Sequence, residues 1–338
     1  MKLPGLVDYN FKNKKVLLRL SLDVPLEVDP HGHLEIKDTT RIDESLETIN
    51  FLIKQKPKQI IVLSHLGRPK GKVVPELSLQ PVAQYLDEKI GRKVKAAGIE
   101  FYLRENLRFD KGEIKNSLVL AKKMARGMDV FVNEAFAVAH RRHASVVGLT
   151  KLLPTFFGFD FLKEWQVLSE LRQNPDRPVV LLLGGAKRDK IELAKKLIYW
   201  ADFVLVGGKL VEYDGLPVLA KHPKVIGSLT HDGKDINEKA VKVFIPILKK
   251  AKTIIWAGPM GAFEEKKSAK GTEMIGKLVA GSKAFKVIGG GDTKTALSSL
   301  NLIDKMDYVS SGGGAMLYFL AHGNLPALER LKNDKDSD

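Results

Sequence analysis

The chain has 338 residues, with 55 Lys or Arg against 40 Asp or Glu and a formal net charge of +15. It contains no cysteine, which excludes disulfides, thiolate nucleophiles and cysteine-bound zinc, and a hydrophobic content of 44% excludes wholesale disorder. No apolar run approaches the roughly 20 residues that span a bilayer and the N-terminus has no signal-peptide core, so we expect a cytoplasmic protein without a membrane partner.

Apolar, β-branched runs recur along the chain and alternate with amphipathic segments of helical period. The predicted strands cover residues 16–24, 59–66, 129–136, 179–185, 202–208, 252–258, 285–292 and 307–314. The clearest helical segments cover residues 41–55, 160–173 and 235–251. Near-continuous apolar strands that alternate with helices indicate parallel sheets covered on both faces.

The order of these segments predicts two α/β domains, each a doubly wound parallel sheet. The helical segment 160–173 separates two groups of strands, and the break NPDRP follows it at 174–178. We therefore predict an N-terminal domain over 1–155, a hinge helix over 156–173 and a C-terminal domain over 174–319.

Polar residues and glycines gather where the predicted strands end. Parallel sheets bind ligands at the carboxyl ends of their strands, so these endings predict a ligand site in each domain. The endings are SHLGR (64–68), NEAF (133–136), GGAK (184–187), WAGPMG (256–261), GGGDT (289–293) and SSGGG (310–314).

Two of these endings indicate phosphate sites in the second domain. In VVLLLGGAKRDKI (179–191) the strand runs into two glycines and a group of cations, where backbone and helix N–H groups could meet an anion. An ordinary turn with solvated lysines remains the alternative. In GGGDTKTAL (289–297), Asp292 or Thr293 would cap the next helix, and Asp292 also suits Mg²⁺ shared with a nucleotide. Neither a G-x-x-x-x-G-K-[ST] nor a G-x-G-x-x-G fingerprint is present.

The first domain contributes arginines beside histidines. Arg68 in HLGRP and Arg141 in HRRH lie at or just after strand ends, and arginine suits bidentate recognition of phosphate or carboxylate. His140 and His143 have no evident third ligand for zinc. A basic pocket on one domain and glycine-rich phosphate loops on the other predict phosphoryl transfer.

These motifs, taken in order, resemble those of the phosphoglycerate kinase family nearly from end to end. The resemblance implies exchange between 1,3-bisphosphoglycerate plus ADP and 3-phosphoglycerate plus ATP, a glycolytic reaction, by a hinge-bending monomer that uses Mg²⁺. The matching stretches are SHLGRPKG (64–71), ENLRF (105–109), VNEAFAVAHRRHASVVG (132–148), GGAKRDKI (184–191), GPMGAFE (258–264), GGGDT (289–293) and GGGA (312–315).

The resemblance also implies roles for individual residues. The catalytic group is Arg41, Lys187 and Gly313. The phosphoglycerate-binding group is Ser21, Asp23, Arg41, His65, Arg68, Arg108 and Arg141. The nucleotide-binding group is Lys190, Glu264, Gly290, Gly291, Asp292 and Thr293, with Asp292 also on the metal. The C-terminal tail 320–338 would pack back on the N-terminal domain.

The sequence departs from the family pattern at several of these positions. Lys187 and Lys190 lie three residues apart rather than four, Ser21 replaces an expected Asp, and Asp23 replaces an Asn. The nucleotide domain is also shortened. Two interpretations stay open, an active phosphoglycerate kinase and a degenerate relative that binds nucleotide or phosphoglycerate without fast turnover. A nucleic-acid-binding protein rests on charge alone, because the cations are scattered and only 7% of residues are aromatic.

Overall fold

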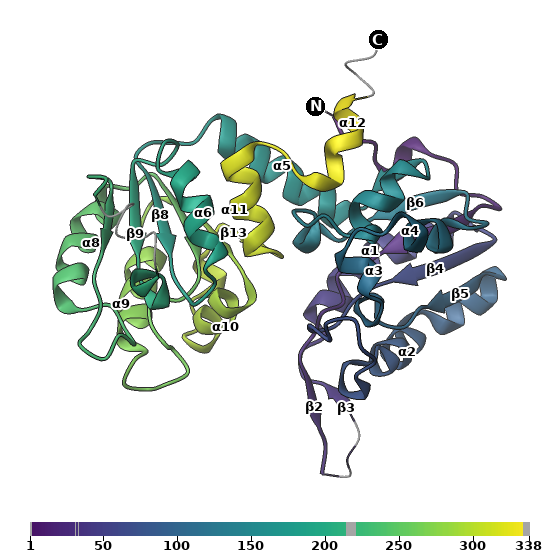
Figure 1. Cartoon of the computed structure of the whole chain (residues 1–338), viewed down its shortest axis with the longest axis horizontal. Helices are drawn as coiled ribbons and strands as arrows, with labels where there is room; N and C mark the ends of the chain where they lie inside the picture. The colour runs from purple at the N-terminus through teal and green to yellow at the C-terminus, as the bar shows by residue number, and fades with distance from the viewer. Residues whose placement is uncertain (1, 31, 33, 214–220, 334–338) are drawn as a thin grey trace. The chain divides into compact units, whose positions relative to one another are not determined.

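The computed structural model describes residues 2–30, 32, 34–213 and 221–333. The chain forms two compact units, which we call unit 1 (residues 1–166 and 325–338) and unit 2 (residues 167–324). Helix α5 (Phe159–Gln173) continues from unit 1 into unit 2 (Figure 1). None of the helices in the described ranges is both long and apolar enough to cross a membrane.

Unit 1 is built on a parallel sheet with the strand order β5-β4-β1-β6-β7. The chain moves outward from β1 in one direction, then returns to β6 on the other side of β1, so the order reverses between β1 and β6. Ligands of doubly wound sheets bind at this reversal. The strands are β1 (Lys15–Arg19), β4 (Gln59–Leu63), β5 (Glu100–Leu103), β6 (Val130–Asn133) and β7 (Thr155–Phe157).

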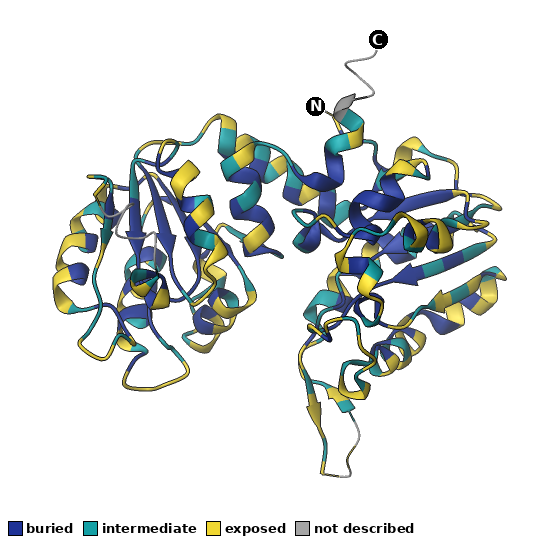
Figure 2. Ribbon diagram, viewed as in Figure 1, coloured by how far each residue is buried: buried dark blue, intermediate teal, exposed yellow. Residues whose placement is uncertain are grey.

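Helices cover both faces of this sheet because alternate strand residues point to opposite sides. Val16 and Leu18 pack in one core with α1 and α2, whereas Leu17 packs in another with α4. Figure 2 shows the strands buried and the outer helix faces exposed. The helices are α1 (Thr40–Lys54), α2 (Gln80–Ala97), α3 (Lys111–Ile114) and α4 (Leu118–Ala125), and the short helix α12 (Glu329–Asn333) belongs to the returning C-terminal segment.

Unit 2 repeats the plan with the parallel order β10-β9-β8-β11-β12-β13, which reverses between β8 and β11. Its strands are β8 (Val179–Leu183), β9 (Phe203–Val206), β10 (Val225–Gly227), β11 (Thr253–Ala257), β12 (Phe285–Gly289) and β13 (Tyr308–Ser310). Its helices are α6 (Asp189–Leu197), α8 (Glu238–Lys250), α9 (Lys270–Ala280), α10 (Gly291–Ser299) and α11 (Gly313–His322).

The two faces of the unit 2 sheet carry different helices. Val180 and Leu182 share a core with α8 and α9, while Leu183 faces α6. Helix α11 packs against α6 on that second face (Figure 1). The predicted fold class, two parallel α/β sheets, is therefore confirmed.

Sequence reasoning missed the short and half-exposed strands. These are β5, β7, β10 and the antiparallel hairpin of β2 (Leu26–Val28) and β3 (Leu34–Ile36). Their burial is partial, so none shows the continuous apolar run of a central strand. The first predicted strand, 16–24, ends at Arg19, because the chain there leaves the sheet to form the loop that holds Asp23.

The predicted C-terminal tail, 320–338, divides into three parts. Residues 320–324 lie in unit 2, where 320–322 complete α11, residues 325–333 lie in unit 1, and residues 334–338 lie outside the described residues. The segment in unit 1 is held by Ala327 N, which donates to Ala139 O at 3.1 Å, and by an ion pair between Arg142 and Glu329 at 2.5 Å.

The first turn of helix α5 donates hydrogen bonds to a buried carboxyl group, that of Glu134. Glu134, just after β6, accepts hydrogen bonds from the backbone N–H groups of Asp160 (3.1 Å) and Phe161 (3.4 Å) and from Thr48 Oγ1 (2.7 Å). Gly158 makes room, because a Cβ there would lie 1.8 Å from Glu134 Oε2. Burial raises the pKa of Glu134 to about 8 against the opposing effect of these donors.

Candidate functional site

In unit 1 the loops after β1 and β4, the start of α1 and the segment after β5 are joined by hydrogen bonds. Asp23 Oδ1 accepts from Gly67 N at 2.8 Å, and Arg41 Nη1 donates to Asp23 O at 3.0 Å. Arg108 Nη1 donates to Gly67 O at 2.7 Å. The structure therefore brings four of the predicted phosphoglycerate-binding positions, Asp23, Arg41, His65 and Arg108, to one end of the sheet.

The cations of this cluster act on one another. Burial, followed by the charge of nearby Arg141, lowers the pKa of Arg108 to about 10. Burial, followed by Arg19, Arg108, His143 and Arg141, lowers the pKa of His65 well below its ordinary value. Among the described groups, Asp23 and Glu113 oppose the lowering of the Arg108 pKa, and an anion bound here would act in the same direction.

The remaining predicted residues of unit 1 differ in environment. Arg68 is exposed and follows Gly67, whose φ of +59° makes the turn after β4. Arg141 lies in the loop after β6 and influences the pKa of Arg108 and His140. Ser21 Oγ is buried and has no hydrogen-bond partner in the described part of the chain. Serine at position 21 therefore leaves a polar atom unpaired near the cluster.

Sequence reasoning assigned no role to Arg19, which is fully buried at the end of β1. Its Nε donates to Ser145 Oγ at 3.0 Å, and its Nη2 lies 2.9 Å from His65 Nδ1. Glu113, also fully buried, accepts from Ser145. An arginine inside the apolar run VLLRL was the available signal, because a buried arginine needs partners.

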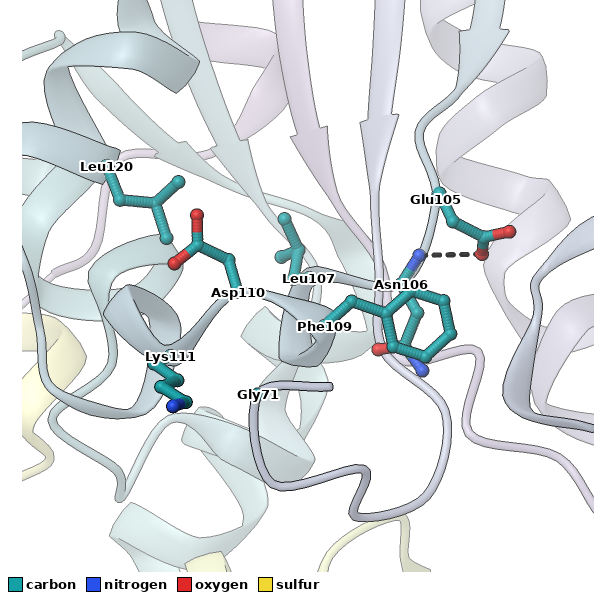
Figure 3. Close-up of a pocket in the computed structure, with 8 residues that line it drawn as sticks. All are labelled: Gly71, Glu105, Asn106, Leu107, Phe109, Asp110, Lys111 and Leu120. Carbon is teal, nitrogen blue, oxygen red and sulfur yellow. Dashed lines mark hydrogen bonds between the residues drawn. The ribbon is translucent and has the colours of Figure 1, made fainter. Parts of the chain in front are cut away.

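A groove of about 560 Å³ lies beside the Arg108 segment (Figure 3). It is lined by Gly71, Glu105, Asn106, Leu107, Phe109, Asp110, Lys111 and Leu120. Glu105 is engaged with Asn106 N at 2.7 Å, and Asn106 Nδ2 donates to Leu66 O at 2.7 Å. None of the predicted site residues lines the groove, and its two carboxylates, Glu105 and Asp110, disfavour a phosphate. We therefore do not assign the substrate to this groove, whose lining residues flank Arg108 in the sequence.

In unit 2 the glycine loops after β8 and β11 interlock at the reversal of strand order. Gly184 N donates to Ala257 O at 3.1 Å, and Gly185 N donates to Pro259 O at 2.8 Å. A Cβ at Gly184 would lie 2.0 Å from Pro259 O, which only glycine avoids. The φ of +101° at Gly258 is likewise a glycine conformation.

The two lysines of GGAKRDKI occupy different environments. Helix α6 begins at Asp189, so Lys187 precedes it and Lys190 lies in its first turn. Lys190 Nζ donates to Gly184 O at 2.6 Å and to Ala257 O at 2.9 Å, and burial, then Lys187, lowers its pKa to about 8. Lys187 is exposed, and its Nζ lies 3.7 Å from Asp292 Oδ2. Ile191, Ala194 and Leu197 are buried and form the packed face of α6.

The predicted helix cap after β12 was wrong. Helix α10 begins at Gly291 with Gly290 as its N-cap. Gly290 has a φ of +102°, which starts the helix before Asp292 and Thr293 in the chain. Thr293 Oγ1 instead accepts from Gly258 N at 2.7 Å and donates to Gly289 O at 3.2 Å, which joins the ends of β11 and β12.

Of the other predicted residues of unit 2, Asp292 and Gly313 lie near other site residues, whereas Glu264 has no contact that joins it to them in the described ranges. Asp292 is exposed in the first turn of α10, beside Lys187. Gly313 lies against the β12 loop, because a Cβ there would meet Gly289 O at 2.6 Å. Glu264 is exposed, and within the described ranges no hydrogen bond or ion pair joins it to the glycine loops. The described residues hold no group of three or more His, Cys, Asp or Glu side chains that could bind a metal.

Comparisons with known proteins agree over nearly the whole chain. A family model described as "Phosphoglycerate kinase" matches residues 6–213 and 220–323. The phosphoglycerate kinase of Finegoldia magna is 37% identical, with 96% of this chain and 98% of the relative covered. That of Thermosipho africanus is also 37% identical, with 97% of each covered. The Finegoldia alignment spans 391 positions, so the relative has segments that the 338 residues here lack.

Solved structures give the same result. The phosphoglycerate kinase structure from Coxiella burnetii is 31% identical, has a TM-score of 0.77 and covers 98% of this chain and 100% of its own. The structure from Pyrococcus horikoshii is 28% identical, has a TM-score of 0.79 and covers 99% of this chain and 100% of its own.

Proposed function

The chain belongs to the phosphoglycerate kinase family, whose members are glycolytic transferases that use ATP and ADP, and from this premise we propose how its residues perform the reaction. The reaction exchanges a phosphoryl group between 1,3-bisphosphoglycerate plus ADP and 3-phosphoglycerate plus ATP. In the proposal, unit 1 holds the phosphoglycerate, unit 2 holds the nucleotide, and α5 is the hinge.

The observation that carries the assignment of unit 1 is its excess of positive charge around His65. Arg141 contributes to lowering the pKa of Arg108 there, and Arg41 is hydrogen-bonded to the same loops through Asp23. A phosphoglycerate carries the anionic oxygens that such donors recognise. Arg68, Ser21 and Asp23 complete the proposed patch at its rim.

In the proposed mechanism, charge neutralisation supplies most of the catalysis. The transferred phosphoryl group spreads negative charge over its oxygens, so Arg41 and Lys187 would stabilise it during transfer. Gly313 would offer its backbone N–H, since it lies in the first turn of α11 where N–H groups have no helical partner.

Unit 2 supports nucleotide binding through backbone as much as side chains. Gly290 and Gly291 open α10, whose N-terminus attracts phosphate, and Lys190 and Thr293 fasten the neighbouring loops. Glu264 would contact the ribose hydroxyls. Asp292 fits Mg²⁺ as a lone exposed carboxylate, because Mg²⁺ usually takes one or two carboxylates with substrate phosphates and water. The bound ion would neutralise nucleotide phosphate charge.

The test is a coupled assay in which the purified protein is given 1,3-bisphosphoglycerate and ADP and the formation of ATP is measured. Calorimetry measures the binding of 3-phosphoglycerate and of ADP to the same protein. Turnover that saturates in both substrates supports the proposal. Binding of both ligands without turnover would show a degenerate member and would contradict the catalytic roles of Arg41 and Lys187.

A further inference from the structure

A buried chain of side chains lies behind His65 in unit 1. Glu113 accepts from Ser145 twice, with Oε1 2.6 Å from the hydroxyl and Oε2 3.0 Å from the backbone N. Ser145 Oγ accepts from Arg19 Nε at 3.0 Å, and Arg19 Nη2 lies 2.9 Å from His65 Nδ1. All four side chains are at most 3% exposed.

The chemistry of arginine decides which atom donates in the hydrogen bond between Arg19 and His65. A guanidinium has only donors, so Arg19 Nη2 donates and His65 Nδ1 must accept. A neutral imidazole carries one proton, which must then be on Nε2. Burial and the surrounding cations keep the pKa of His65 well below its ordinary value, so the ring is neutral near pH 7. Nε2 faces the cluster, 3.7 Å from Asp23 Oδ2.

We propose that Arg19, with Glu113 as its buried counter-ion, is a positioning residue that holds His65 as the neutral Nε2–H tautomer for phosphoglycerate binding. The proposal rests on the proposed function of unit 1. His65 then offers the ligand an uncharged donor and no acceptor at Nε2. This selects an acceptor oxygen of the substrate and adds no further charge to the cluster.

Glu113 is the reason that Arg19 can stay charged while fully buried. Burial alone would raise the pKa of Glu113, but His143, Arg19 and Ser145 together hold it below its ordinary value. Burial lowers the pKa of Arg19 to about 10, and Glu113 and Asp23 act in the opposite direction. Arg19 and Glu113 are thus both ionised although both are buried behind His65.

A purely structural role for Arg19 makes different predictions. Its Nη1 donates to Leu20 O and lies 3.5 Å from Leu63 O, so it also ties the ends of β1 and β4. If that were its whole contribution, its loss would lower stability but leave the His65 tautomer and the pH dependence of substrate binding unchanged.

The experiment measures the ring-nitrogen shifts of ¹⁵N-histidine-labelled protein, with His65 assigned from a His65→Gln sample. Wild type should show an unprotonated Nδ1 and a protonated Nε2 at position 65. Removing Arg19 alone would leave the buried Glu113 without the charge of the arginine, so the main variant is Arg19→Met with Glu113→Gln, which removes both charges together. Arg92→Met, an exposed arginine of α2, is the matched control.

In the double variant we expect a mixture of His65 tautomers and a pKa of His65 closer to its ordinary value, because Arg19 is the largest charge that lowers it. The KM for 3-phosphoglycerate should rise about 10-fold, the loss of one hydrogen bond to a charged ligand, with the KM for ATP unchanged. A wild-type Nδ1–H tautomer, or an unchanged tautomer and pH profile in a folded double variant, would overturn the proposal.

The same spectra separate this proposal from the proposed function. If 3-phosphoglycerate shifts the His65 resonances of wild type but the tautomer is the other one, only the role of Arg19 fails. If saturating 3-phosphoglycerate leaves the His65 resonances unchanged, the placement of the substrate in unit 1 fails instead.

Discussion

Units 1 and 2 share one strand plan but build their candidate sites from different materials. Both sheets reverse their strand order beside the first strand of the unit, at β1 and at β8. Strand β1 ends in the buried side chain of Arg19, whereas β8 is followed by Gly184, which is packed against the backbone of Pro259. In unit 1 the candidate binding groups are side chains that other side chains position. In unit 2 they are backbone groups of glycine loops that hydrogen-bond to one another.

This difference bears on the departures from the family pattern. In unit 2 the apolar face of α6 is buried, and Lys187 lies in the turn before Asp189, where we expect the shortened loop to be accommodated. In unit 1 the side chain of Asp23 accepts a hydrogen bond from Gly67 N, whereas Ser21 Oγ lacks a partner among the described residues. Substitutions should thus act through charge in unit 1 and through backbone geometry in unit 2.

The largest expected effect is that of Arg41→Ala in unit 1. A guanidinium aimed at charge that develops during transfer is worth several kcal/mol, so kcat should fall on the order of 10²-fold or more. Within the described residues the side chain of Arg41 makes one hydrogen bond, to Asp23 O, so the melting temperature should change little and ADP binding not at all. Steady-state kinetics, thermal melting and calorimetry measure the three quantities. A near-normal kcat would remove Arg41 from the catalytic group.

Gly184→Ala tests the backbone site of unit 2. The new Cβ would lie 2.0 Å from Pro259 O and 2.6 Å from Gly258 O, so the loops must separate. Overpacking of this kind costs about 1–3 kcal/mol in the free energy of unfolding, and ADP affinity should fall with it. The matched control is Gly281→Ala, where the nearest atom lies 3.4 Å from the new Cβ. Equal denaturant midpoints for the two variants would contradict the interlocked-loop description.

The sequence predicted the fold and the central strands because long buried strands leave a continuous apolar run, as VVLLL does in β8. It also placed the glycine loops, because glycine at a strand end has few other uses. It missed Arg19 and Glu113, because these buried charges lie 94 positions apart in the sequence and only the fold shows that Ser145 links them. It placed the cap of α10 wrongly, because the φ of Gly290 decides that position.

Asp292→Asn probes a single exposed side chain of unit 2. The amide keeps the shape but loses the charge, so the affinity for ADP with Mg²⁺ should fall by about 10-fold. In EDTA the two proteins should bind ADP nearly equally, because Asp292 is predicted to act through the metal and is otherwise paired with Lys187. Calorimetry in both buffers makes the measurement. An equal loss of affinity in EDTA would assign Asp292 a role without metal.

The smallest expected effect concerns Lys190, whose ammonium donates to two backbone carbonyls beside the glycine loops. Lys190→Ala should weaken ADP binding more than Lys187→Ala, whereas Lys187→Ala should mainly lower kcat. Lys190 Nζ is bound to Gly184 O and Ala257 O next to the proposed phosphate site, while Lys187 is exposed. Equal, small effects of both substitutions on binding and rate would exclude this loop as a phosphate site.

The pH dependence of ADP binding sharpens this contrast between the lysines. Burial, then repulsion by Lys187, sets the pKa of Lys190 at about 8, so its ammonium is charged below that pH and lost above it. ADP affinity should therefore fall several-fold from about pH 7 to about pH 9, and Lys190→Met should abolish the fall. Lys187→Met removes the repulsion and should move the midpoint to higher pH, whereas Lys195→Met, on the exposed side of α6, should not. A midpoint that stays fixed in Lys187→Met would show that burial alone sets the pKa of Lys190, and that the two lysines of the shortened loop act independently.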